Sequence, residues 1–172
     1  WEDYPDGFDW DILKEKDYIN FYTYHKKFDY WLEADIGDIV ICHSTNIKIE
    51  NNKKSKFVYK PRITAISTIT QRRHKFENGK EGVTITNRVN ISRPIFKFEL
   101  DVNQIINNSE PYKRGSDRCV ITKLHENEYK EIIKEIVRKN PKLKNAIEKL
   151  EKELGKRTEN LEKAIETLLQ GE

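Results

Sequence analysis

The chain has 172 residues, of which 36% are hydrophobic and 35% are charged, and its formal net charge is +3. This length favours one domain of ordinary size. No apolar run approaches the roughly 20 residues needed to cross a bilayer, and no signal-peptide pattern is present, so we expect a soluble cytoplasmic protein without a membrane partner. Cys42 and Cys119 lie in apolar runs and lack metal-site spacing, which indicates buried, reduced thiols.

The N-terminal segment is acidic and rich in aromatic rings. We expect short helices over residues 8–16 and 24–33, and seven aromatic residues lie within Tyr18–Leu32. Tyr22 and Tyr24 share a face if this segment is extended, and each hydroxyl needs a partner when buried. Flat rings of this kind can stack a planar base, whereas residue types alone favour an ordinary hydrophobic core.

A Gly-Asp turn then opens a short apolar strand, Ile39–His43, which we expect to end on the polar run His43-Ser44-Thr45-Asn46. Residues 43–75 carry nine Lys or Arg and the single acid Glu50. Such a concentration of positive charge on a nearly neutral chain indicates a polyanion footprint. A solvated loop over "KIENNKKSK" explains the same residues equally well.

Strands dominate the middle of the chain. Their β-branched, alternating segments are expected over residues 60–71, 83–91, 95–100 and 118–124. Asn78-Gly79 predicts a hairpin, after which Val83, Ile85, Val89 and Ile91 are expected on one face. The order of elements predicts an α+β fold built on a small curved mixed sheet or partial barrel, flanked by short helices.

Two helical segments close the sequence. A helix over 125–140 ends at Asn140-Pro141, which divides a domain at 1–140 from an amphipathic tail at 141–172. The tail cannot bury its apolar seam alone, so it packs back on the domain, self-associates or leads into a further domain. The seam consists of Leu143, Ile147, Leu150, Leu154, Arg157, Leu161, Ala164 and Leu168.

Motifs of catalysis do not occur in the sequence. It contains no phosphate-binding loop, dinucleotide fingerprint, nucleophile elbow or HExxH motif, and its four His are scattered. "PDGFDWDILKEK" invites comparison with metal-dependent nucleases, but Glu15-Lys16 lacks the intervening residue and lies in helix-like sequence. We therefore expect no enzyme activity, no catalytic residue, no cofactor and no metal site.

Three segments together resemble the EVE branch of the PUA-like superfamily. "FYTYHKKFDYWLEADIGDIVICHSTN" with "PRITAISTIT" is similar to the family's aromatic segment, helix, Gly-Asp turn and strand ending in His-Ser-Asn-like residues. "NRVNISRPIFKFEL" resembles its strand that ends at a Pro, and "RGSDRCVITKLHENEYKEII" its closing turn, strand and helix. The resemblance spans about residues 8–138. The sequence departs from the family at Cys42, where an aromatic is usual, and at Ala65-Ile66-Ser67, where glycines are usual.

The resemblance implies a module that reads modified or flipped bases, related to the YTH domains that bind N6-methyladenine in RNA. Within this group, N-terminal domains of McrB-type restriction proteins recognise methylated DNA. They precede a helical linker and a GTP-hydrolysing AAA+ domain that works with a nuclease subunit. The implied partner is therefore nucleic acid, with DNA favoured over RNA. The implied base pocket consists of Trp10, Asn20, Tyr22, Tyr24, His43, Ser44, Thr45 and Asn46.

Phosphate contacts would supply the remaining, salt-dependent affinity of such a reader. The candidates are Lys53, Lys54, Lys56, Lys60, Arg72, Arg73, Lys75, Lys113 and Arg114. Two alternatives stay open: a PUA- or YTH-like module that uses the same pocket on RNA, and an assembly adaptor that acts through the heptad tail.

Overall fold

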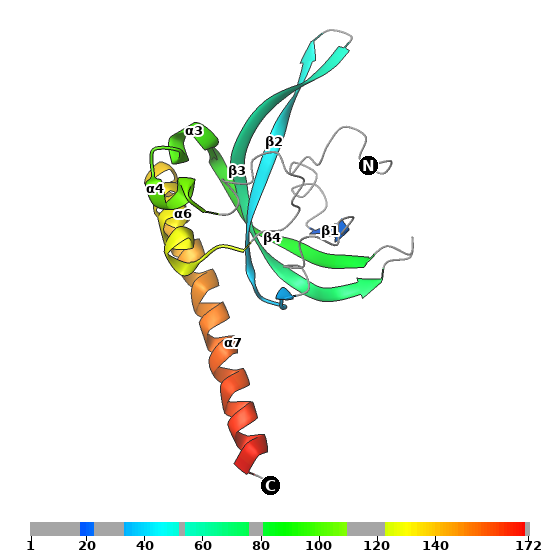
Figure 1. Cartoon of the computed structure of the whole chain (residues 1–172), viewed down its shortest axis with the longest axis vertical. Coiled ribbons are helices and arrows are strands. Elements are labelled where there is room, and N and C mark those ends of the chain that lie inside the picture. The colour runs from blue at the N-terminus through cyan, green and yellow to red at the C-terminus, as the bar shows by residue number, and fades with distance from the viewer. Residues whose placement is uncertain (1–17, 23–32, 52–53, 76–80, 110–122, 171–172) are drawn as a thin grey trace.

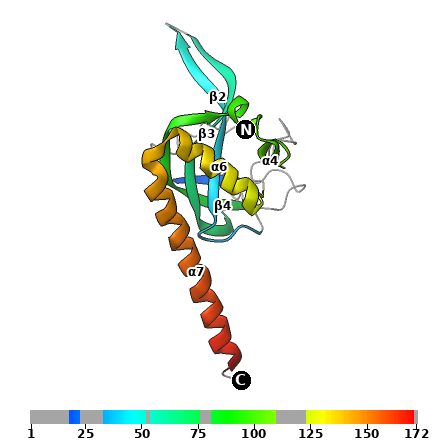
Figure 2. The same cartoon turned by 90° about the vertical axis from the view of Figure 1, so that its left-hand side faces the viewer.

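The computed structural model describes residues 18–22, 33–51, 54–75, 81–109 and 123–170. Four strands form one antiparallel sheet in the order β1-β4-β3-β2: β1 (Tyr18–Tyr22), β2 (Ile39–Asn51), β3 (Lys54–Lys75) and β4 (Glu81–Phe96). The helices lie on one side of this sheet (Figures 1 and 2): α3 (Lys97–Leu100), α4 (Gln104–Asn107), α6 (Glu126–Lys139), the 3-10 helix η1 (Pro141–Leu143) and α7 (Lys144–Gln170).

The predicted α+β class is confirmed, with differences in the sheet. The described strands pair only in antiparallel fashion, and their sheet is open, so the expected mixed pairing is not seen in these residues. Lys75 pairs with Glu81, which confirms the hairpin predicted at Asn78-Gly79. Within the same described ranges, no helix is long and apolar enough to span a membrane.

The strand predicted to end at His43 does not end there. β2 continues to Asn51 and pairs with the first part of β3, forming a two-stranded arm that extends away from the helices (Figure 1). The loop interpretation of residues 48–56 is therefore wrong for the described part of that segment. Ile47, Ile49 and Val58 alternate with polar residues, a pattern that favours extended backbone. The two strands of the arm satisfy each other's backbone hydrogen-bonding groups.

Buried side chains of β4 divide between the two faces of the sheet. Val83 and Ile85 pack in one hydrophobic cluster, whereas Val89 and Ile91 pack in another. The pairing with β3 shifts register between the two pairs, which leaves Arg88 as an extra residue. Because side chains alternate along a strand, one inserted residue sends the later ones to the opposite face. The prediction that all four share one face is therefore wrong.

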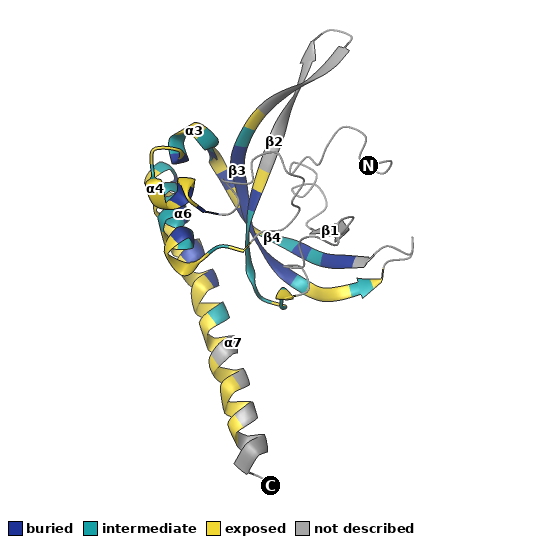
Figure 3. Cartoon of the chain, viewed as in Figure 1, coloured by how far each residue is buried: buried dark blue, intermediate teal, exposed yellow. Residues whose placement is uncertain are grey.

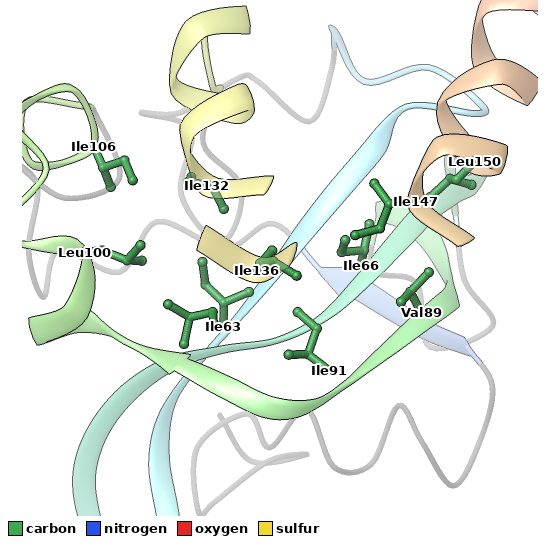
Figure 4. Packing of buried hydrophobic residues seen from close by; sticks show 11 residues of the cluster. Ile63, Ile66, Val89, Ile91, Leu100, Ile106, Ile132, Ile136, Ile147 and Leu150 are labelled. Carbon is green, nitrogen blue, oxygen red and sulfur yellow. The ribbon is translucent and has the colours of Figure 1, made fainter. Parts of the chain in front are cut away.

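The larger cluster lies between the sheet and the helices, and Figure 4 shows its side chains converging from both layers. Burying this apolar surface is the main term that stabilises the fold. Every member is at most 8% exposed: Ile63, Ile66, Val89, Ile91, Ile95, Leu100, Ile106, Ile132, Ile136, Ile147 and Leu150. Since α7 supplies Ile147 and Leu150, the first turns of the predicted tail pack on the sheet's own core.

Asn140 joins the end of α6 to β4. Its side chain is 5% exposed, accepts a hydrogen bond of 2.9 Å from the Arg93 amide and donates one of 3.0 Å to the Arg93 carbonyl. It thereby satisfies backbone groups in a stretch of β4 where the ladder with β3 is interrupted. Pro141 follows at once and begins η1, which confirms the predicted break at Asn140-Pro141.

The remainder of α7 reaches beyond the sheet and the other helices (Figures 1 and 3). Tyr129 of α6 donates a hydrogen bond of 3.0 Å to Glu151 of α7, one turn before the helix leaves the domain. Leu154 is half-buried, whereas Ala164 is exposed. The predicted seam is therefore used by the domain in its first half, Leu143–Leu154.

Candidate nucleic-acid interface

The central feature of the candidate site is an irregularity in the pairing of β2 with β3. The register shifts between Cys42 and His43 and again between Ser44 and Asn46, and each shift leaves an extra residue on β3. We call this stretch of the two strands, opposite Cys42–Asn46, the double bulge. Bulges bend a strand, re-aim its side chains and recur next to functional sites. The strand end predicted at His43 is therefore replaced by an irregularity through which β2 continues.

A buried hydroxyl lies within the double bulge. Cys42 pairs with Ala65 and His43 pairs with Ile63, so Thr64 is the extra residue on β3. Thr64 is 2% exposed, and its Oγ1 has no hydrogen-bond partner. Buried polar groups almost always have one. An unsatisfied hydroxyl beside a bulge is what we expect where a ligand or an ordered water completes a site.

His43 is the one residue of the implied base pocket whose side chain the structure describes. Burial among surrounding atoms, followed by the positive charges of Lys97 and Arg62, lowers the pKa of His43 to about 4. The residue nevertheless keeps exposed surface, and burial lowers its pKa more than either cation does. A neutral imidazole carries one donor and one acceptor, which suits the edge of a base.

The adjacent Cys42 has a structural role. It is fully buried, and its Sγ lies 3.2 Å from the Ser67 Oγ. Burial raises the pKa of the Cys42 thiol to about 12, against a smaller opposing effect of the Ser67 hydrogen bond. The thiol is therefore un-ionised and unreactive at neutral pH, as a buried reduced cysteine should be. Cys119 lies outside the described residues.

Beside the double bulge lies a group of aromatic and cationic side chains, Lys60, Phe96, Phe98 and Lys139, which we call the Phe96 cluster. Lys60 Nζ lies 4.9 Å and Lys139 Nζ 5.3 Å from the centre of the Phe96 ring, both within the range of cation–π attraction. Phe98 stacks on Phe96 with ring centres 5.7 Å apart and planes 9° from parallel. Arg62, paired with both Ser44 and Phe96, links the two features across three strands.

The Phe96 cluster is held in place by α6. Lys139 Nζ donates to the Pro94 carbonyl at 2.8 Å and to the Glu99 carboxylate at 2.6 Å. Burial alone would raise the pKa of Glu99, but the hydrogen bonds from Lys139 and from the Phe96 amide hold it below its ordinary value. Glu99 is therefore ionised at neutral pH, and its ion pair with Lys139 fixes α3 against α6.

Sequence reasoning missed Phe96 and Phe98 because it placed both on a strand over 95–100. β4 instead ends at Phe96, and the next four residues form α3. Glu99 accepts a hydrogen bond of 2.8 Å from the Phe96 amide, the contact that starts the helix. Apolar residues at 96, 98 and 100 alternate as a strand would, and Phe is not an N-cap residue that signals a helix. No sequence signal distinguishes the two outcomes.

Two further residues of the implied base pocket, Asn20 and Tyr22, are not brought beside His43 by the sheet. Asn20 and Tyr22 lie on β1, opposite Thr84 and Gly82 of β4, and β1 and β2 are the two edges of the sheet. Three strand spacings, roughly 14 Å, separate these edges across the sheet. Ser44, Thr45 and Asn46 are placed as backbone in β2, and Trp10 and Tyr24 lie outside the described residues.

The predicted phosphate contacts are also dispersed. Lys60 is exposed beside Phe96, whereas Arg72 is bound by Asp35, with Nε to Oδ1 and Nη2 to Oδ2 both at 2.6 Å. Arg73 and Lys75 are exposed near the far end of β3. Lys54 and Lys56 are placed as backbone in the arm, and Lys53, Lys113 and Arg114 lie outside the described residues.

A cavity of about 250 Å³ opens elsewhere, between α7, the sheet and the turn that precedes β2. None of the predicted site residues lines it. Its walls are Ile36, Gly37, Thr68, Ile69, Thr70, Arg88, Leu150, Glu153 and Leu154. Among the described residues, no group of three or more His, Cys, Asp or Glu is placed to hold a metal ion.

Comparison with protein-family models gives no match for this chain, and comparison with curated proteins gives none either. Its function is therefore inferred from its own residues.

Proposed function

We propose that this chain binds methylated DNA by holding one flipped base at the double bulge, as the recognition module of a restriction or defence system. The observation that carries the proposal is the juxtaposition of His43 with an unsatisfied buried hydroxyl, Thr64, at an irregularity of the sheet. Lys60, which is exposed in the neighbouring Phe96 cluster, supplies a positive charge nearby. Polar groups for a base edge and cations for a phosphate are the two requirements of such a reader.

The energetics are compatible with this role. Flipping a base out of a duplex costs a few kcal/mol, and stacking on an aromatic side chain returns about 1–3 kcal/mol. His43 contributes polarity without charge, because its pKa of about 4 keeps it neutral at pH 7. A neutral donor and acceptor can distinguish base edges, while the lysines contribute affinity that does not depend on sequence.

The test uses three duplexes that differ only in one base: unmodified, N6-methyladenine or 5-methylcytosine. A fluorescent adenine analogue next to the modified base reports its departure from the stack. Wild-type protein should bind one modified duplex most tightly and raise the fluorescence. Equal affinity for all three duplexes, with unchanged fluorescence, would overturn the proposal.

Two variants and one control sharpen the test. Thr64→Val keeps the side chain's shape but removes the hydroxyl, so it should stabilise the fold slightly while weakening discrimination between duplexes. His43→Ala should weaken the same discrimination. His74→Ala, near the other end of β3, is the matched control and should leave it unchanged. Replacing every thymidine and deoxyribose by its RNA counterpart tests the RNA alternative, since an RNA reader depends on the 2′-hydroxyl.

The reach of α7 beyond the rest of the fold favours a second function, that of an assembly adaptor (Figure 1). Its test is truncation, and the structure decides where to cut. Removing residues 142–172 would delete Ile147 and Leu150, which belong to the core, and would unfold the chain. Ending the chain at Gly155 keeps both. An adaptor should then lose its partner or self-association while DNA binding stays unchanged.

A further inference from the structure

Phe98 is an exposed aromatic residue that neither the core nor the double bulge employs. It is 67% exposed, although it lies between the half-buried Lys97 and Glu99 in a helix of only four residues. One face of its ring covers Phe96, in an almost parallel stack. The opposite face of the ring is therefore open to solvent and available to a second flat group.

The ring is held rigidly, which suits a binding surface. Phe96, on which it rests, lies beneath the ammonium groups of Lys60 and Lys139. Lys139 is itself fixed by Glu99 and by the Pro94 carbonyl. A flat surface that is already ordered loses little conformational entropy when a second flat group stacks on it.

The charge around the ring favours a nucleic acid over an apolar protein surface. Lys60 has no ion pair with any described residue, and its ammonium group lies over the Phe96 ring. Lys97, next to Phe98, forms an ion pair with Asp101. Its positive charge also helps to lower the pKa of His43. Exposed Val102 and Ile105 lie close by in the chain and would suit a protein partner, so they serve as controls.

We propose that Phe98 is a second base-stacking surface, outside the double bulge, which takes a base left unstacked when the target nucleotide leaves the duplex, while Lys60 contacts the adjoining phosphate. This inference rests on the proposed function and adds to it a specific ligand contact. It also identifies the class of ligand for the Phe96 cluster, a planar base on a negatively charged backbone. Stacking of this kind tolerates any sequence, because every base has a flat face.

The first experiment measures affinity of the full chain for a single-stranded oligothymidine and for the modified duplex. Phe98→Ala should weaken binding to both by about 5- to 140-fold, which corresponds to about 1–3 kcal/mol. The slope of log affinity against log salt should not change, since no phosphate contact is lost. Lys60→Ala should instead lower that slope by about 0.9 on duplex DNA and about 0.7 on the single strand. Val102→Ala, 84% exposed in the wild type, should change neither.

A second measurement reports stacking directly. Phe98→Trp keeps a flat ring, so it should bind like the wild type, and the fluorescence of the new indole should be quenched when oligothymidine binds. Val102→Trp is the matched control and should not be quenched. Thermal melting of each variant confirms that the fold is intact, as expected for substitutions at exposed sites.

The outcomes separate this inference from the proposed function. If His43→Ala loses discrimination between duplexes while Phe98→Ala binds normally, the inference fails and the proposed function stands. If wild-type protein binds neither probe, both fail. If Phe98→Ala and Val102→Ala weaken binding equally, or if Phe98→Trp is not quenched, the ring is no stacking surface and the α3–α4 segment serves a protein partner instead.

Discussion

The two ends of β3 both carry basic residues, but these residues differ in exposure and in ion pairing. Near its start, Lys60 is exposed beside Phe96, and Arg62 lies with Lys97 close to His43. Near its end, Asp35 binds Arg72 through both carboxylate oxygens. The sequence contains a single basic segment, whereas the structure separates it into one end that is available to a polyanion and one that is partly neutralised.

The two ends of β3 lie too far apart to act as one compact binding surface. Lys60 and Arg72 are twelve positions apart, and a strand rises about 3.3 Å per residue, so up to about 40 Å separates them along β3. The acid that binds Arg72 comes from the turn before β2, which the sheet places beside the end of β3 through the bond of 2.7 Å from the Gly37 amide to the Ile69 carbonyl. Charge counted along a sequence therefore does not locate an electrostatic footprint.

The largest expected effects test whether the two ends differ in folding as well as in surface charge. Ile63→Ala near the start of β3 and Ile69→Ala near its end remove side chains that are 2% and 3% exposed. Each should lower the free energy of unfolding by about 2–5 kcal/mol, measured by urea denaturation. Ile105→Ala, at 42% exposure, is the control and should cost far less. If one core variant proved as mild as the control, that end of the strand would be only loosely packed.

A smaller effect is expected when surface charges at the two ends of β3 are removed and the salt dependence of DNA binding is compared. Lys60→Ala should lower the slope of log DNA affinity against log salt by about 0.9, the value for one lost phosphate contact. Arg72→Ala removes the same charge at the other end but should change the slope by less than half as much, because Asp35 already neutralises the guanidinium. Arg72 is thereby distinguished from the other cations predicted to contact phosphate. Should Arg72→Ala lower the slope as much as Lys60→Ala does, the footprint lies at the far end.

Releasing Arg72 should make the two ends more alike. Asp35→Asn removes the ion pair, whose partners are 41% and 66% exposed in their side chains, so we expect little loss of stability. DNA affinity should rise at low salt, because a cation is now available to a phosphate. The double variant Asp35→Asn with Arg72→Ala is the control and should cancel the gain. A gain that survives in the double variant would have another cause.

The sequence predicts the fold well where one local signal dominates. The pairing of β3 with β4 and the end of α6 are each predicted by one dipeptide, Asn78-Gly79 and Asn140-Pro141, because the backbone preferences of these residues are local. Prediction from the sequence fails where the outcome depends on distant partners. The bulge at Arg88 that divides Val83 from Val89 depends on the register with β3, and the Asn140 hydrogen bonds reach a residue 47 positions away. Phe98 is exposed because α3 replaces a strand, and alternation of apolar residues cannot reveal that.

The smallest effect concerns pH and the double bulge. The pKa of His43 is lowered from 6.5 to about 4, so the unfolded chain binds more protons than the folded chain between these values. The free energy of unfolding should therefore fall as pH is lowered from about 6.5 toward 4, and this contribution should not change further below that. Because His43 keeps exposed surface, solvent screening reduces the effect. The pKa values of Glu99 and Glu126 are lowered from 4.5, and their contributions are lost only as pH approaches and passes below 4.5, so the upper part of this range reports the histidine with the least interference.

Urea denaturation at four pH values within that part of the range measures the slope. His43→Gln should flatten it, because glutamine keeps a polar side chain but cannot be protonated. His74→Gln, near the other end of β3, is the matched control and should leave the slope of the wild type largely intact. A slope that His43→Gln does not alter would mean that His43 is as well solvated in the folded chain as in the unfolded one. In that case the double bulge does not hold a neutral imidazole at acid pH, and the two ends of β3 differ only in their ion pairs.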